Sequence, residues 1–283
     1  MEQVILSKPV SVLAGCNVCL MGPSGTGKTH SIGTLVDTGM EVFYLALEPG
    51  LESLLGYYTD KGKPIPDNLH WHTLDAPKAS FLELIDSAKK INALSFESIT
   101  KMQDPNRSKH NQFIGLLEAL NNFPDDRTGK TFGPVNEWTP SRALVMDGLT
   151  GLNNAAMALV IGGKPVKNQA DWGVAQDQVY KILNLLCASC DCHFILIAHV
   201  ERETDQVLGG VKITISTLGK ALAPRLPVMF SDVILTVRQA DKWFWDTASM
   251  MADVKTRNLP ILSTNQPTFA TIIAKWKARG GVA

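Results

Sequence analysis

The chain has 283 residues, 45 % of them hydrophobic, and its 27 Lys and Arg residues balance its 27 Asp and Glu residues. This length and composition suit a globular protein with a sizeable core, built as one large α/β domain or two small ones. The neutral balance excludes an overall field that would draw the chain onto nucleic acid or an anionic membrane, so any such binding depends on local patches.

The N-terminal stretch "MEQVILSKPV" lacks the basic and apolar regions of a signal peptide. The longest strongly apolar runs, such as "FILIAHV", are too short to span a bilayer. We therefore expect a cytoplasmic protein that has no membrane partner.

Five cysteines raise the question of a metal site or disulfides, because Cys16 and Cys19 form a CxxC pair and Cys187, Cys190 and Cys192 cluster. The first pair lies in an apolar stretch, and the second group ends an amphipathic helix, where small hydrophobic residues are expected. The odd number also suits reduced thiols. We interpret all five as packing residues.

The apolar run "VSVLAGCNVCLM" is followed by "GPSGTGKT", which fits the phosphate-loop pattern G-x-x-x-x-G-K-[ST]. A strand must deliver this loop and a helix must start from it, since backbone N–H groups at a helix N-terminus bind phosphate. "THSIGTLVDTG" predicts that helix, with its end at Gly39. Lys28 should reach the β and γ phosphates of ATP, and the Thr29 hydroxyl should bind Mg²⁺. The expected nucleotide-binding residues are Gly22, Pro23, Ser24, Gly25, Thr26, Gly27, Lys28, Thr29 and His30.

A second apolar strand, predicted over residues 42–47, ends in Glu48. A carboxylate at this strand end would lie beside the γ-phosphate, where it could orient and deprotonate water. The alternative is an acid at the start of a helix, with Pro49 at the first helical position.

Residues 80–94 predict a helix on a face of the sheet. Residues 95–140 are polar around one short amphipathic helix, "FIGLLEALNNF", and we interpret them as an insertion without assigned chemistry.

The metal carboxylate follows this insertion. Residues 143–146 predict a short buried strand that ends in Asp147, the Walker B pattern for Mg²⁺ binding. Asp147 is followed by Gly148 and not by a second acid. The base that activates water must therefore come from another element, which favours Glu48.

The segment "GVAQDQVYKILNLLCASC" has apolar residues at helical spacing and predicts a helix that covers the sheet. The strand "HFILIAHV" follows it and is expected to end at His199. At this strand end, His199 could sense the nucleotide through a hydrogen bond. The alternative is an ordinary capping or core histidine.

The C-terminal part alternates short apolar strands with turns and predicts strands over residues 233–237, 243–245 and 251–257. The last strand would place Lys255 and Arg257 on one face, because side chains at i and i+2 share a side. A solvated edge is the plain alternative. We expect one domain over residues 1–283, with residues 232–276 as a β-rich C-terminal part.

This order of motifs resembles the RecA-like ATPases, a group that includes recombinases, DnaB-type helicases and the KaiC type. It is most similar to compact phage-encoded RecA-like ATP-binding proteins, some of which are single-strand annealing recombinases. The likeness extends from about residue 8 to residue 260 and includes "DWGVAQD", "LIAHVERETD", "TLGKALAPRLPVMFSDVI" and "VKTRNLP". It implies an α/β P-loop NTPase core, with a mostly parallel twisted sheet flanked by helices and a C-terminal antiparallel β extension.

The resemblance also implies roles for residues and partners. It gives Glu48 as general base, Asp147 and Thr29 for Mg²⁺, and His199 as sensor. In the helicase and KaiC branches a Lys-x-Arg pair reaches the neighbouring subunit's ATP, and Lys255 and Arg257 match that pair. Lys220 and Arg225 are rivals for this task. A homo-oligomeric ring or filament with shared ATP sites follows, in the host cytoplasm if a phage encodes the chain.

In the recombinases two loops hold DNA, and here they correspond to residues 160–171 and 201–217. Lys164 and Lys167 in the first loop suit phosphate contact, whereas the second loop is rich in Glu and Asp and has no aromatic residue for base stacking. We expect a Mg²⁺-dependent ATPase in recombination, single-strand annealing or replication, with single-stranded DNA and a single-strand binding protein as partners. The alternative is a KaiC-like assembly or regulatory ATPase without direct DNA action.

Overall fold

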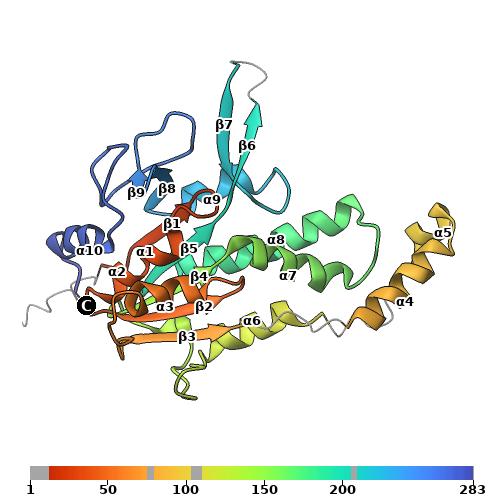
Figure 1. Cartoon of the computed structure of the whole chain (residues 1–283), viewed down its shortest axis with the longest axis horizontal. Coiled ribbons are helices and arrows are strands. Elements are labelled where there is room, and N and C mark those ends of the chain that lie inside the picture. The colour runs from red at the N-terminus through yellow and green to blue at the C-terminus, as the bar shows by residue number, and fades with distance from the viewer. Residues whose placement is uncertain (1–12, 75–79, 103–109, 205–208, 283) are drawn as a thin grey trace, which may run out of the picture.

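A seven-stranded sheet runs through the body of the protein, in a computed structural model that describes residues 13–74, 80–102, 110–204 and 209–282 (Figure 1). Its strand order is β3-β2-β4-β5-β1-β8-β9, and β6 and β7 form a separate two-stranded sheet. All neighbours in the large sheet are parallel except β8 and β9. The strands are β1 (Asn17–Met21), β2 (Glu41–Ala46), β3 (Leu69–Thr73), β4 (Arg142–Asp147), β5 (His193–Ala198), β6 (Val200–Thr204), β7 (Val211–Ile215), β8 (Asp232–Gln239) and β9 (Lys242–Asp246).

Helices flank the sheet on both faces. The helices of the described residues are α1 (Lys28–Ser31), α2 (Gly33–Val36), α3 (Leu51–Thr59), α4 (Phe81–Asn92), α5 (Phe96–Lys101), α6 (Gln112–Asn121), α7 (Leu149–Ile161), α8 (Gln169–Ala188), α9 (Leu226–Met229) and α10 (Phe269–Ala278), with short 3₁₀ turns η2 (Val135–Glu137) and η3 (Ala223–Arg225), and α4 and α5 do not pack on the sheet. In the described parts of the chain, no helix is long and apolar enough to cross a membrane.

The core has two halves, one on each face of the sheet. Helices α2, α3 and α10 bury their apolar side chains on one face, and α6, α7 and α8 do so on the other. The central strands are therefore buried on both sides, which explains why their sequences are continuous apolar runs without alternation. The predicted α/β class is confirmed, including the mostly parallel sheet and the antiparallel C-terminal pair β8 and β9.

The helix predicted over residues 80–94 forms as α4, but its expected position on the sheet is wrong. Helix α4 projects from the body together with α5, and none of its residues is buried (Figure 1). Phe81 and Leu82 are 86 % and 74 % exposed. Ser80 and Glu83 form a capping box that stabilises the helix start locally. The sequence predicted the helix correctly, but it does not determine which element, if any, covers the helix.

The predicted strand over residues 251–257 is also wrong. Lys255 forms only an isolated antiparallel bridge with Val233, and the chain then turns around Asp232. Strand alternation therefore does not set the directions of Lys255 and Arg257. The chain ends instead in α10, whose apolar residues pack against the sheet.

The side chain of Asp232 organises this C-terminal turn. It is fully buried, and its Oδ1 accepts hydrogen bonds from the Thr256 hydroxyl at 2.9 Å and from the Arg257 and Asn258 backbone N–H groups at 2.8 and 2.9 Å. Its Oδ2 accepts from Asn258 Nδ2 at 2.6 Å. One carboxylate thus takes the place of the ladder that a regular strand would have made.

We predict that Asp232→Ala lowers the free energy of unfolding by about 3 to 5 kcal/mol, because several donors lose a buried acceptor and each unsatisfied group costs about 1 to 3 kcal/mol. Urea denaturation measures the change. Asp253→Ala is the matched control, since Asp253 pairs with Lys212 at the surface and a surface pair contributes about 0 to 1 kcal/mol. Equal losses in the two variants would contradict the anchoring role.

Candidate active site

Four strands, β1, β2, β4 and β5, deliver their following loops to the same edge of the sheet because they are parallel. A pocket of about 540 Å³ opens there. Its lining includes the phosphate loop from Ser24 to His30 and the side chains of Glu48, Asp147, His199 and Trp243. The structure thus brings most of the predicted site residues together.

The phosphate loop joins β1 to α1 in a tight turn. Gly25 and Gly27 have φ angles of 75° and 78°, in the left-handed region that favours glycine. The Thr26 hydroxyl lies 2.6 Å from that of Thr236 in β8, which ties the loop to the C-terminal strand pair.

Lys28 is buried beneath this loop. Its Nζ donates hydrogen bonds to the carbonyl oxygens of Gly22 and Pro23 at 2.8 and 2.7 Å. Burial lowers the pKa of Lys28 to about 8, although Asp147 and Glu48 favour the charged form. The neighbouring groups therefore stabilise the charge of the ammonium only in part, and phosphate oxygens would stabilise it further.

A hydroxyl and a carboxylate form the candidate metal site. Thr29 Oγ1 donates to Asp147 Oδ2 at 2.7 Å, and the Tyr44 hydroxyl donates to the same oxygen at 2.6 Å. Burial raises the pKa of Asp147, and the bonds from Tyr44 and Thr29 oppose that effect. Two hard oxygen donors suit Mg²⁺, which is usually bound by one or two carboxylates together with phosphates and water.

No cluster of three or more His, Cys, Asp or Glu side chains suited to a metal occurs among the described residues. A cation at Thr29 and Asp147 would therefore need the nucleotide as a ligand. Tyr44 is a site residue that sequence reasoning missed. It lies inside an apolar strand, and the sequence alone does not predict that it pairs opposite Val145 in the neighbouring strand β4. The only signal was one hydroxyl in the run "VFYLAL".

Glu48 lies across the pocket from the phosphate loop. Its Oε1 accepts from the Gly151 backbone N–H at 2.8 Å, and its Oε2 lies 3.5 Å from His199 Nε2. Helix α3 starts at Leu51 with Gly50 as its N-cap, so the alternative of a helix-start acid with Pro49 at the first helical position is wrong. The carboxylate is oriented by a backbone donor and a half-exposed imidazole.

Gly148 makes room for this carboxylate. A Cβ atom at residue 148 would lie 2.8 Å from Glu48 Oε1 and 3.0 Å from Glu48 Cδ. The residue after Asp147 is thus small because the acid comes from the neighbouring strand β2.

Two aromatic side chains, His30 and Trp243, also line the pocket. The sequence analysis expected His30 at the site but did not predict Trp243. Trp243 Nε1 donates to the Gly25 carbonyl oxygen at 3.2 Å. The His30 ring lies 5.0 Å from both the Trp243 and Tyr57 rings. Such rings are chemically suited to stacking with a nucleobase. Trp243 comes from strand β9, and only the β8–β9 pairing carries it to the phosphate loop.

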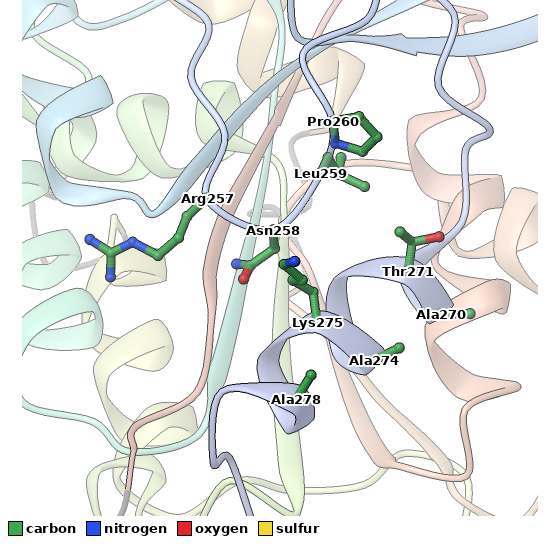
Figure 2. A pocket seen from close by; sticks show the side chains of 9 residues that line it. All are labelled: Arg257, Asn258, Leu259, Pro260, Ala270, Thr271, Ala274, Lys275 and Ala278. Carbon is green, nitrogen blue, oxygen red and sulfur yellow. The ribbon is translucent and has the colours of Figure 1, made fainter.

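Lys255 and Arg257 do not join this pocket. Arg257 lies beside Asp232 at the amino end of β8, whereas the phosphate loop follows the carboxyl end of the parallel strand β1. Arg257 borders a separate groove against α10 (Figure 2). The rivals are engaged elsewhere, because Arg225 lies 3.9 Å above the Tyr180 ring and Lys220 pairs with Glu203.

The two loops proposed for DNA have different structures. In the first, Lys164 pairs with Asp171 at 3.3 Å, and the Lys167 ammonium lies 5.3 Å from the Trp172 ring. The second forms the β6–β7 hairpin that stands out from the body, with residues 205–208 outside the described residues (Figure 1). Both lysines of the first loop are thus already held by neighbours.

All five cysteines are free thiols, and all except Cys187 are buried. Burial raises the pKa of Cys16 and Cys187 to about 12 and that of Cys190 to about 11. The thiolate is therefore disfavoured at neutral pH, which agrees with a packing role.

Comparison with known proteins gives a matching family model and similar solved structures. A family model described as "AAA domain" matches residues 14–259. The crystal structure of the RadB recombinase aligns with 88 % of this chain and 85 % of its own, at 12 % identity and a TM-score of 0.43. No curated protein matches by sequence.

We predict that Gly148→Ala lowers ATP turnover by about 10² or more, since a misplaced general base loses most of its contribution. Nucleotide affinity should stay within a few-fold, because the added methyl meets only the flexible end of Glu48. Turnover and binding of a fluorescent ATP analogue measure the two effects. Gly173→Ala is the control, since a Cβ there contacts nothing within 4 Å. Normal turnover in Gly148→Ala would contradict the role of this gap.

Proposed function

The chain belongs to the AAA domain family, and from that premise we propose that it is a Mg²⁺-dependent, RecA-like ATPase of recombination or single-strand annealing. One observation carries the proposal. A phosphate loop, a Thr29–Asp147 pair and the Glu48 carboxylate converge in one pocket, each from a different strand end. These are the parts that phosphoryl transfer to water requires, because its catalysis is mostly positioning and charge stabilisation.

Each residue has a distinct task in this proposal. The backbone N–H groups of the phosphate loop and the Lys28 ammonium bind the phosphates. Mg²⁺, when bound with the nucleotide, would neutralise developing charge on the phosphates. Glu48 orients water and takes its proton, while His199 responds to the nucleotide through its contact with Glu48. Tyr44 holds the Asp147 carboxylate in place.

Lys255 and Arg257 are proposed to complete the pocket of a neighbouring subunit. They lie at the opposite edge of the sheet from their own phosphate loop, so they cannot act on their own nucleotide without a large movement. A head-to-tail contact joins two different surfaces and generates a ring or a filament. Such a contact would bring the amino edge of one subunit to the ATP pocket of the next.

The biological task proposed is recombination, annealing or replication of phage type, on single-stranded DNA and beside a single-strand binding protein. It is tested by the ATPase rate per subunit against protein concentration, with and without single-stranded DNA. A rate that climbs with concentration supports shared sites. An ATPase rate that single-stranded DNA raises, by an amount that falls as the salt concentration increases, supports the DNA function.

A second function, ATP-dependent assembly of a protein complex, is favoured by the arm formed by α4 and α5. Phe81, Leu82 and Phe96 are 86 %, 74 % and 76 % exposed on this arm. Exposed apolar residues gathered on one element are typical of protein–protein contacts. Ring formation and ATP turnover without any response to DNA would favour this function.

We predict that ATP affinity falls as the pH rises above about 8, the pKa that burial gives Lys28. Phosphates stabilise the ammonium, so its pKa is higher in the complex and binding takes up a proton in this range. The dissociation constant should approach an increase of about tenfold per pH unit. Calorimetric titration from pH 7 to 9.5 measures it.

Lys28→Arg provides the control for this pH dependence, because a guanidinium stays charged throughout the range. Its affinity should be weaker but independent of pH. A constant affinity in the unmodified protein up to pH 9.5 would show that Lys28 is not the group involved.

We predict that Arg257→Ala loses about 10³ to 10⁵ in turnover, the usual contribution of an arginine finger, while it still binds ATP. Glu48→Gln should be equally inactive. In a random 1:1 mixture about a quarter of the head-to-tail contacts join an intact Glu48 to an intact Arg257, so turnover should return to roughly that fraction. Steady-state phosphate release measures the turnover of the mixture. A mixture as inactive as its two components would contradict an ATP site shared between subunits.

A further inference from the structure

The neutral charge of the chain hides an uneven distribution. Residues 254–283 contain no Asp or Glu but five cations, whereas the preceding part carries 22 cations and all 27 acids. The five are Lys255, Arg257, Lys275, Lys277 and Arg279, and all are exposed. The C-terminal part is thus strongly basic while the rest of the chain is acidic.

Two of these cations, Arg257 and Lys275, line a groove between residues 257–260 and α10, with a volume of about 750 Å³, and the Arg257 side chain points away from α10 (Figure 2). Ala270, Ala274 and Ala278 form its helical wall, and their small side chains leave the space open. Lys275 stands on the same wall. Arg279 donates to Asn258 Oδ1 at 3.0 Å and to the Arg257 carbonyl oxygen at 2.6 Å, which ties α10 to the opposite wall.

Among the described residues, none of the five cations forms an ion pair with an acidic side chain. The nearby Asp232 is fully buried and accepts its hydrogen bonds mainly from the turn at residues 256–258. Asp253, the last acid before the basic part, pairs with Lys212.

We propose that the α10 side of this groove, with Lys275, binds the sugar–phosphate backbone of single-stranded nucleic acid, while Lys255 and Arg257 keep their proposed place at the neighbouring subunit's pocket. The inference deepens the proposed function and rests on its DNA-directed form. Cations that gather around an open groove attract a polyanion, and bound counterions released from the strand supply the driving force. None of the described residues that line the groove is aromatic, so recognition would be independent of base sequence.

A lipid surface fits the groove less well. The apolar residues of α10, which are Phe269, Ile272, Ile273 and Trp276, are buried in the core. The helix therefore has no free apolar face to insert into a membrane, as an interfacial helix requires. Lys275 on the α10 wall forms no ion pair with an acidic side chain of the described residues, whereas Lys164 in the loop at residues 160–171 pairs with Asp171.

The test compares two variants, each with two charge reversals. Fluorescence anisotropy measures how tightly each binds a labelled single-stranded oligonucleotide in the presence of a non-hydrolysable ATP analogue. Lys275→Glu with Lys277→Glu alters α10, and Lys89→Glu with Lys90→Glu makes the same charge change on α4, far from the groove (Figure 1). The α10 variant should bind about tenfold or more weakly, and its slope of log K against log salt should shrink by about 1.4 for two lost phosphate contacts. The α4 variant should match the unmodified protein.

Binding of the ATP analogue, measured on the same samples, should be equal in all three proteins and shows that they are folded. If the α10 variant binds the oligonucleotide like the unmodified protein, nucleic-acid binding by the groove is wrong, and the proposed function is unaffected. Equal weakening in both variants also contradicts nucleic-acid binding by the groove, since bulk charge would then be the cause. An unmodified protein that hydrolyses ATP but binds only phosphatidylserine vesicles, or no strand at any salt, overturns both the groove and the DNA-directed function.

Discussion

The carboxylate and carbonyl of Asp147 connect the elements on which the site depends. Its Oδ2 accepts from Thr29 at the start of α1 and from Tyr44 in β2, and its carbonyl oxygen accepts from the backbone N–H groups of Leu47 and Glu48. One residue therefore connects the phosphate loop, the candidate metal ligand Thr29 and the candidate base Glu48. Because the bond from Tyr44 is buried, a displaced partner there would leave a polar group unsatisfied.

A consequence of this arrangement is that acid and metal ligand come from different strands. Glu48 follows β2 and Asp147 ends β4, and their backbones are hydrogen-bonded at that point. Gly148 leaves the space that the Glu48 carboxylate fills. A glycine in place of a second acid after Asp147 therefore fits the position of the Glu48 carboxylate, the candidate base.

The C-terminal part links the two edges of the sheet. Through Thr236 and Trp243 the β8–β9 pair contacts the phosphate loop, and through Asp232 it anchors the turn that carries Arg257. A basic groove at the amino edge and an ATP pocket at the carboxyl edge are therefore joined by a single strand, β8.

The sequence by itself determined the strands β1, β2, β4 and β5 and the polar residues at their ends, because a buried parallel strand is a continuous apolar run and a phosphate loop needs its glycines. Only the tertiary structure decided three other matters. Helix α4 has an apolar face that periodicity cannot assign to a partner, Lys255 and Arg257 follow Asp232 instead of a strand, and Tyr44 and Trp243 reach the pocket through strand pairing. For Arg257, Tyr44 and Trp243 the deciding contact joins residues far apart in the chain, which local sequence patterns do not reveal.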